Sequence, residues 1–269
     1  MSEGAAGAAP FTALVLAGSR GPDDPIARAR NVAHKCLALV AGVPMLARVA
    51  LTLAESPSVG RIAIALEDPR LLDELPALRP LRDAGRCAAI GTGATPSLTV
   101  LRALDELAAP LPWLVVTGDH PLLTPAIVEH FCAAACATGA DLAAGLTPAS
   151  AIRAVYPEAQ RTYLRFRDEH YSGANLYALL GPDARRAVAF WRRAELERKR
   201  PWRLVRAFGW RPLLAYLLGR LTLNSAMGRA SRITGCRVAA VPLPFAEAAI
   251  DVDKPADLEL VETILARRG

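Results

Sequence analysis

Charged residues follow the ends of several apolar runs in this sequence. The first run, Phe11 to Ala17, stops at Gly18, and Lys35 comes later, after a polar loop. The run predicts a buried parallel strand, and the glycine predicts a tight loop whose exposed N–H groups can bind phosphate. The residues that we expect to contact a phosphate-bearing ligand are Ala17, Gly18, Ser19 and Gly21, with Arg20 and Lys35 as cations beside them.

Acidic residues follow two later apolar runs. A run that starts at Trp113 leads into Asp119. The later segment Ala249-Ile-Asp-Val-Asp253 holds Asp251 and Asp253 at alternating positions, which would lie on one side of a strand. Ligands bind at the carboxyl ends of strands in open α/β sheets, and carboxylates beside phosphate oxygens are typical of Mg²⁺ sites. We expect Asp119 to be a metal ligand, although a turn or helix cap is the alternative. Asp251 is favoured as the second ligand, with Asp253 as an outer member of the metal site or the cap of a helix near Pro255.

Two further segments are candidates for nucleotide contacts. Gly91 to Ser97 opens a predicted helix, so its backbone and the Ser97 hydroxyl could bind a base edge. The alternative is a glycine-rich loop with a serine N-cap. Ser172, Gly173 and Asn175 lie at the start of an apolar strand, where the glycine would admit a ligand and the asparagine could bind hydroxyl groups. A plain turn into the strand is the alternative.

The elements that must position these residues alternate between strands and helices. Apolar runs predict strands at 11–17, 61–66, 113–117, 141–146 and 238–243, and helical patterns occupy 44–55, 97–109, 124–137 and 255–267. This alternation indicates an α/β fold with a mostly parallel sheet. The run from Gly173 predicts one more strand, for which we favour an antiparallel direction. We expect a single domain over residues 1–269, with residues 183–233 as a basic helical insertion.

Composition indicates a protein with a sizeable core and argues against a membrane-spanning or a nucleic-acid-binding protein. With 269 residues and 52% hydrophobic residues the chain can build a sizeable core, and no apolar run approaches the roughly 20 residues that span a bilayer. Five cysteines without a C-x-x-C pair predict free thiols in a reducing cytoplasm. The net charge of +6 is concentrated between Arg185 and Arg211, which hold ten Lys/Arg and two acids. No nucleic-acid motif accompanies this charge, so we expect no nucleic-acid partner.

The residues quoted above resemble those of the MobA-like nucleotidyltransferase superfamily. The resemblance rests on the segment Leu16-Ala-Gly-Ser-Arg-Gly21, on Lys35, on Gly118-Asp119-His-Pro and on Ile250-Asp-Val-Asp-Lys-Pro-Ala-Asp-Leu. It implies a Rossmann-like three-layer sheet, Mg²⁺ as cofactor, and attack of an acceptor on the α-phosphate of an NTP. The acceptor itself does not follow from the resemblance, and we expect a small phosphorylated molecule. It assigns Gly18, Arg20 and Lys35 to phosphate, and Asp119 with one of Asp251 and Asp253 to the metal.

The resemblance also bears on the base. The segment from Gly91 to Ser97 is similar to the region where cytidylyltransferases read their base, so CTP is the expected NTP. The chain departs from these families at Ser19, where a second glycine is usual, and at His34, where proline or aspartate commonly precedes the lysine.

Two other functions compete with nucleotidyl transfer. A glycosyltransferase of similar fold would use the same sheet, but it usually shows Asp-x-Asp where this chain has Thr117-Gly-Asp119. A membrane-surface binding module could use the basic, aromatic helices of 185–211. We favour a lid over the acceptor site for the insertion, together with Arg161, Arg165 and Arg167. Peripheral contact with an anionic membrane, at its inner face, is a secondary role.

Overall fold

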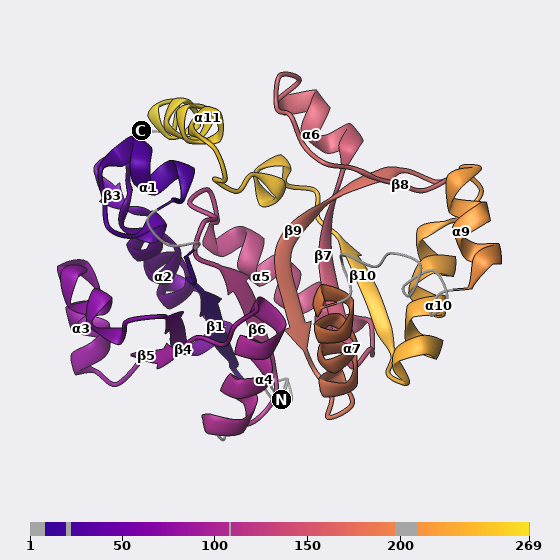
Figure 1. Ribbon diagram of the computed structural model, residues 1–269, viewed down its shortest axis with the longest axis horizontal. Helices are drawn as coiled ribbons and strands as arrows, with labels where there is room; N and C mark the ends of the chain where they lie inside the picture. The colour runs from indigo at the N-terminus through magenta and orange to yellow at the C-terminus, as the bar shows by residue number, and fades with distance from the viewer. Residues whose placement is uncertain (1–8, 20–22, 108, 197–208, 269) are drawn as a thin grey trace, which may run out of the picture.

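The computed structural model describes residues 9–19, 23–107, 109–196 and 209–268. Its strands form one mixed sheet in the order β10-β7-β9-β6-β1-β4-β5, with β8 paired to β9 (Figure 1). The strands are β1 Phe11–Leu16, β4 Val59–Leu66, β5 Cys87–Gly91, β6 Trp113–Thr117, β7 Leu142–Pro148, β8 Leu164–Arg165, β9 His170–Leu179 and β10 Val238–Pro242, and a small separate pair is formed by β2 Leu39–Val40 and β3 Val43–Pro44. Strands β4, β1 and β6 run parallel to one another, whereas β9 is antiparallel to β6 and β7.

Helices cover both faces of the sheet. The α-helices are α1 Pro25–Arg30, α2 Met45–Glu55, α3 Arg79–Asp83, α4 Pro96–Glu106, α5 Pro125–Ala137, α6 Ala149–Val155, α7 Ala184–Leu196, α9 Trp210–Leu217, α10 Leu223–Thr234 and α11 Pro255–Ala266. Short 3₁₀ helices are η1 Lys35–Leu37, η2 Pro69–Glu74, η3 Pro76–Leu78 and η4 Ala246–Ala249. None of the helices within the described ranges is both long and apolar enough to cross a bilayer.

The alternation of side chains along β1 divides the core into two layers. Ala13 and Val15 pack in a cluster with residues of α2 and α5, whereas Leu14 packs on the other face with residues of α4 and α7. Successive strand side chains point to opposite faces, so a strand with both faces apolar must be covered on both sides. This arrangement confirms the predicted three-layer, mostly parallel α/β fold.

Most predicted elements are present at the predicted places. Each of the five strands ends within two residues of its prediction, and the strand through Gly173 is antiparallel, as β9. The predicted helix 97–109 instead runs over α4, because Thr95 caps it and Pro96 occupies its first turn. Strand β5 was not predicted, because Cys87-Ala-Ala-Ile-Gly91 is short and rich in alanine.

The segment 183–233 contributes to two different places in the fold. Helix α7 lies in the same layer as α4, and Arg185 pairs with Asp105 of α4 at 2.7 Å. Helix α10 packs beside the edge strand β10, where the Val238 N–H donates to the Ser231 hydroxyl at 2.9 Å. The part of the predicted insertion from 197 to 208 lies outside the described residues. The described part therefore includes a helix of the sheet's own covering layer.

Candidate active site

The carboxyl ends of the parallel strands bring three loops together. A side chain at Gly18, just after β1, would place its Cβ 3.2 Å from Glu67 Oε1 and 3.8 Å from Thr92 Cγ2. Glu67 follows β4 and Thr92 follows β5, so neighbouring strands supply the three loops. The buried Ala17 continues the β1 ladder through its N–H, which donates to Ala65 O at 3.1 Å. Gly18 thus leaves room at the meeting point of these loops.

Glu67 joins the loop after β1 to the segment that contains Lys35. Its Oε1 accepts the backbone N–H of Ser19 at 2.7 Å, and its Oε2 lies 3.3 Å from His34 Nε2. His34 is buried, and its Nδ1 accepts the Cys36 N–H at 3.2 Å. Glu67 and His34 were not among the predicted site residues. Two other residues of the first loop, Arg20 and Gly21, lie outside the described part of the chain.

Lys35 lies between two of the predicted carboxylates. Its Nζ is 2.6 Å from Asp119 Oδ2 and 2.9 Å from Asp253 Oδ1, and its side chain is only 9% exposed. Burial alone would lower the pKa of Lys35, but the charges and hydrogen bonds of the two carboxylates outweigh burial and hold that pKa above its ordinary value. Lys35 is therefore a fixed cation at neutral pH.

The two carboxylate oxygens of Asp119 have different surroundings. While Oδ2 accepts from Lys35, Oδ1 is buried and has no hydrogen-bond partner among the residues that the structure describes. Gly118 lets this loop approach the sheet closely, since a Cβ there would be 3.2 Å from Ala17 Cβ and 3.3 Å from Cys36 Sγ. A buried carboxylate oxygen without a partner is costly unless a cation or water binds it. The chemistry of this atom fits a metal ligand.

Asp251 is held by two residues from other parts of the chain. Arg161 donates to its Oδ1, and the amide of Asn175 donates to its Oδ2 at 2.9 Å. Arg161 also donates to Asp257 Oδ1 at 2.7 Å, with its own side chain almost fully buried. Burial raises the pKa of Asp251, the nearby charge of Asp119 adds to this, and Arg161 opposes it. Both oxygens of Asp251 are thus engaged within the protein.

The alternative role of Asp253 as a helix cap is wrong. The cap of α11 involves Asp257, whose Oδ2 accepts the N–H groups of Asp253 at 3.1 Å and Lys254 at 3.0 Å. The Asp253 side chain instead pairs with Lys35. Within the described ranges, no three His, Cys, Asp or Glu side chains are placed together as a metal site. Metal binding by Asp119 with Asp251 or Asp253 stays a prediction.

Ser97 is oriented away from solvent. It is fully buried, and its hydroxyl donates to Glu195 of α7. The N-cap of α4 is Thr95, whose Oγ1 accepts the Leu98 N–H at 3.3 Å, so the serine N-cap is wrong. Direct reading of a base by Ser97 does not fit this conformation, because the hydroxyl already has a protein partner. Gly91, at the end of β5, leads into the loop that approaches Gly18.

The start of β9 borders the same region. Ser172 is buried and pairs with Thr147 of β7, whereas a Cβ at Gly173 would meet no atom within 4 Å. Asn175 has a left-handed backbone, with φ of 51°, close to a register shift in the β7–β9 ladder. This local irregularity accompanies the contact of its side chain with Asp251. Of the three predicted residues, Asn175 is the one that touches the carboxylate network.

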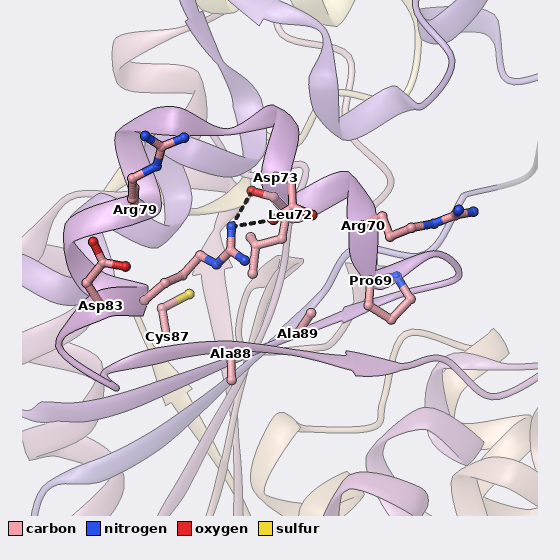
Figure 2. Close-up of a pocket in the computed structure, with 10 residues that line it drawn as sticks. Pro69, Arg70, Leu72, Asp73, Arg79, Asp83, Cys87, Ala88 and Ala89 are labelled. Atoms are coloured by element: carbon pink, nitrogen blue, oxygen red, sulfur yellow. Dashed lines mark hydrogen bonds and ion pairs between the residues drawn. The ribbon is translucent and has the colours of Figure 1, made fainter.

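A separate surface hollow contains none of these residues. It has a volume of about 670 Å³ and lies between the first part of β5, η2 and α3 (Figure 2). Arg82 in its wall pairs with Asp73 at 2.7 Å and approaches the Leu72 carbonyl. The hollow is lined by the first three residues of β5, whereas the strand-end loops meet at the other end of this strand, near Gly91. It therefore plays no part in the candidate active site.

Comparison with known proteins identifies the family. Residues 13–188 match the model of the MobA-like NTP transferase domain. No curated protein gives a significant sequence match. A structure described as a hypothetical transferase from Thermus thermophilus is 31% identical, covers 93% of this chain and 99% of its own, and superposes with a TM-score of 0.77.

Two more distant structures share the fold. A 4-diphosphocytidyl-2C-methyl-D-erythritol synthase from Anaerococcus prevotii is 12% identical, with a TM-score of 0.59 and coverage of 96% of this chain and 97% of its own. A CMP:2-keto-3-deoxy-manno-octonic acid synthetase, solved with CTP, is 16% identical, with a TM-score of 0.56 and coverage of 97% and 100%. The match over residues 13–188 spans more than half of the chain, and the strand-end site lies where this fold places its ligands. The chain belongs to the MobA-like NTP transferase domain family of nucleotidyltransferases.

Proposed function

We propose that this protein is a Mg²⁺-dependent cytidylyltransferase that transfers CMP from CTP to a small phosphorylated acceptor. A phosphate oxygen of the acceptor forms a bond to the α-phosphorus of CTP. The bond between that phosphorus and the oxygen bridging to the β-phosphate breaks, and the electron pair leaves with pyrophosphate. Nucleotidyl transfer of this kind demands positioning and charge compensation more than covalent chemistry from the protein.

The observation that supports this proposal most is the position of Lys35. Its protonated amine lies between Asp119 and Asp253, and the preceding residue, His34, lies 3.3 Å from Glu67 of the loop after β4. A cation held there can stabilise the charge that develops on the α-phosphate oxygens. The exposed N–H groups around Gly18 and Ser19 would bind the same phosphate chain, which requires Glu67 to release the Ser19 N–H.

For the metal, the proposal assigns Asp119 and Asp253 rather than Asp251. Asp119 has a buried oxygen that no group in the described part of the chain binds, and the Asp253 side chain is half exposed. Asp251 already has Arg161 and Asn175 as partners, so its role is to position this end of the site. When bound, Mg²⁺ would neutralise phosphate charge as the α-phosphorus bonds change.

The preference for CTP is supported by the fold relatives and by the loop after β5. Both distant structures carry a cytidylyl or CMP group in their names, and one holds CTP. In this chain Thr92 lies beside Gly18, so the backbone of this loop, rather than the Ser97 side chain, would face the base. The open space at Gly173 and the nearby Asn175 amide offer room and hydrogen bonds for the acceptor. The five free cysteines favour a reducing cytoplasm as the location.

The test is a screen of the four NTPs against a panel of phosphorylated small molecules, with pyrophosphate release as the readout. We expect release with Mg²⁺ and CTP and none with EDTA. Asp119→Asn should lower turnover by a factor on the order of 10² or more, because the metal offsets transition-state charge. Asp105→Asn, a change of the same kind on the exposed surface of α4, is the control.

Two outcomes would contradict the proposal. A clear preference for GTP or ATP would overturn the cytidylyl assignment while leaving nucleotidyl transfer intact. Sugar transfer from a nucleotide sugar, without pyrophosphate release from any free NTP, would indicate the glycosyltransferase alternative.

A further inference from the structure

Helix α9 presents a row of large apolar side chains to solvent. Trp210, Leu214, Leu217 and Leu218 are 65%, 46%, 71% and 56% exposed. Their spacing places them on one face of the helix. Single exposed apolar residues are ordinary, but a contiguous row that includes a tryptophan marks an interaction surface.

The opposite face of α9 is anchored to the domain. The Tyr216 ring packs against Phe166 with centroids 6.1 Å apart, and its hydroxyl accepts the Arg165 N–H at 3.3 Å. The Arg167 N–H donates to Leu221 O at 2.9 Å, just beyond the helix. These contacts fix the orientation of the helix, and this orientation exposes the apolar row to solvent.

A cationic notch lies beside the apolar row. It has a volume of about 430 Å³ between α9 and α10, and three arginines line it: Arg211, Arg229 and Arg232. None of the described residues that line it is acidic, and the Arg211 guanidinium lies 5.4 Å from the centroid of the Trp210 ring. In the sequence, residues 209–246 contain five arginines and no Asp or Glu. Acidic residues from other segments lie near α10, since Asp168 accepts the Leu223 N–H and Arg232 lines another hollow with Asp141 and Asp183. Positive charge therefore predominates at the notch itself.

We propose that α9 is a docking site for the surface of an anionic phospholipid bilayer. The row from Trp210 to Leu218 enters the boundary between headgroups and acyl chains, and the notch of arginines receives a lipid phosphate. Amphipathic helices with a cationic polar side bind membranes in this way, and each basic residue near an anionic surface strengthens the attraction.

Other partners fit the same surface less well. A second copy of the chain would bring Arg211 and Arg232 against their own equivalents, which like-charge repulsion opposes. A nucleic acid would pair with the arginines but would leave Leu214 and Leu217 without an apolar environment. The bilayer alone satisfies both the charge and the apolar row.

The experiment is co-sedimentation of the full chain with vesicles, without nucleotide, so that its result does not depend on the proposed activity. Vesicles of phosphatidylcholine alone are compared with vesicles that also contain phosphatidylglycerol, each at low and high salt. We expect binding to the anionic vesicles at low salt, several-fold weaker binding at high salt because of screening, and little binding to pure phosphatidylcholine.

Two variants separate the charge from the apolar row. The double change Arg229→Gln and Arg232→Gln should weaken binding by about tenfold or more, since each basic residue near an anionic surface contributes about fivefold. Leu217→Gln should also weaken binding to the vesicles. The effect should be larger at high salt, where the charge attraction is screened. Matched controls are Arg70→Gln, an exposed arginine on η2, and Val155→Gln, an exposed apolar residue at the end of α6. Circular dichroism confirms that each variant is folded.

Three results would overturn the proposal. One is no binding to anionic vesicles at low salt. Another is binding that the control variants reduce as much as the α9 and notch variants do. The third is a stable dimer, by light scattering, that Leu217→Gln converts to monomer, because the row would then be an interface between copies of the chain.

Discussion

At the level of single residues, Lys35 is the cation that pairs with two carboxylates of the site. It bonds to Asp119 and Asp253, and its own side chain is buried. Lys35→Ala should lower kcat by a factor on the order of 10²–10³ with a smaller change in KM, because the charge acts mostly on the transition state. Lys254→Ala, an exposed lysine nearby, is the matched control. Equal effects of the two changes on kcat would contradict the role of Lys35.

Lys35 also predicts how stability depends on pH. Its pKa is raised in the folded protein, so the native state keeps a proton that the unfolded chain loses above about pH 10.4. The stability from its ion pairs is present below that pH and is lost as pH rises toward the folded value. We expect the difference in Tm between the unmodified protein and Lys35→Met to shrink between about pH 10 and pH 11. A difference that grows over this range would contradict the assignment.

Arg161 is the residue whose loss should harm the fold most directly around the site. It is buried between Asp251 and Asp257, and removal leaves both carboxylates without their cation. Arg161→Met should lower the free energy of unfolding by about 3–5 kcal/mol in urea titrations, whereas Arg161→Lys should restore part of it. Arg28→Met, at an exposed arginine, should change it little. Comparable losses at both positions would rule out a special role for Arg161.

At the level of elements, a partly buried hydrogen bond joins α4 to α7. The Ser97 hydroxyl donates to Glu195, so Ser97→Ala leaves a carboxylate without its partner. We expect a loss of about 1–3 kcal/mol in the free energy of unfolding and an unchanged preference among NTPs. Arg185→Gln, which breaks the exposed pair with Asp105 between the same helices, should cost less than about 1 kcal/mol. A changed NTP preference in Ser97→Ala would instead support the original hypothesis that Ser97 contacts the base.

The elements were predictable wherever their own residues determine them. The continuous apolar run of β1 and the proline at the start of α5 and of α11 are local signals, and the structure confirms these elements. Strand β5 was missed because five residues with two alanines give too little periodicity, and the strand forms by pairing with β4. The place of α7 beside α4 likewise depends on tertiary packing.

At the level of the whole molecule, the candidate site was only partly predictable. Lys35, Asp119 and Asp253 lie together, and Asp119 follows the end of β6, as the sequence predicts. Lys35 instead begins η1, and Asp253 lies between η4 and α11. Arg161 and Glu67 were not assigned to this network, because their partners lie far away in the sequence: 90 residues from Arg161 to Asp251, and 48 from Ser19 to Glu67. The sequence around a charged residue in a loop does not predict which distant residue will pair with it.

Ligand binding should stabilise the molecule in a metal-dependent way. A ligand at 100 times its Kd adds about 2.7 kcal/mol to the free energy of unfolding, so CTP with Mg²⁺ should raise Tm by several degrees. CTP with EDTA should raise the Tm less. In Asp119→Asn, the Tm shifts with Mg²⁺ and with EDTA should be nearly equal. The measurement is differential scanning fluorimetry. Equal shifts with and without the metal in the unmodified protein would argue against a metal at Asp119.

The ion pairs of Lys35 also restrict when the protein can become active during its synthesis. Asp119 lies 84 residues after Lys35, and Asp253 lies 218 residues after it. On the ribosome, the first three parallel strands and the lysine emerge long before the segment that contains Asp253. A nascent chain can therefore pair Lys35 with Asp119 early, but Lys35 cannot pair with Asp253 until residue 253 has also emerged. The order of synthesis thus delays the appearance of a working site until the fold around it is in place.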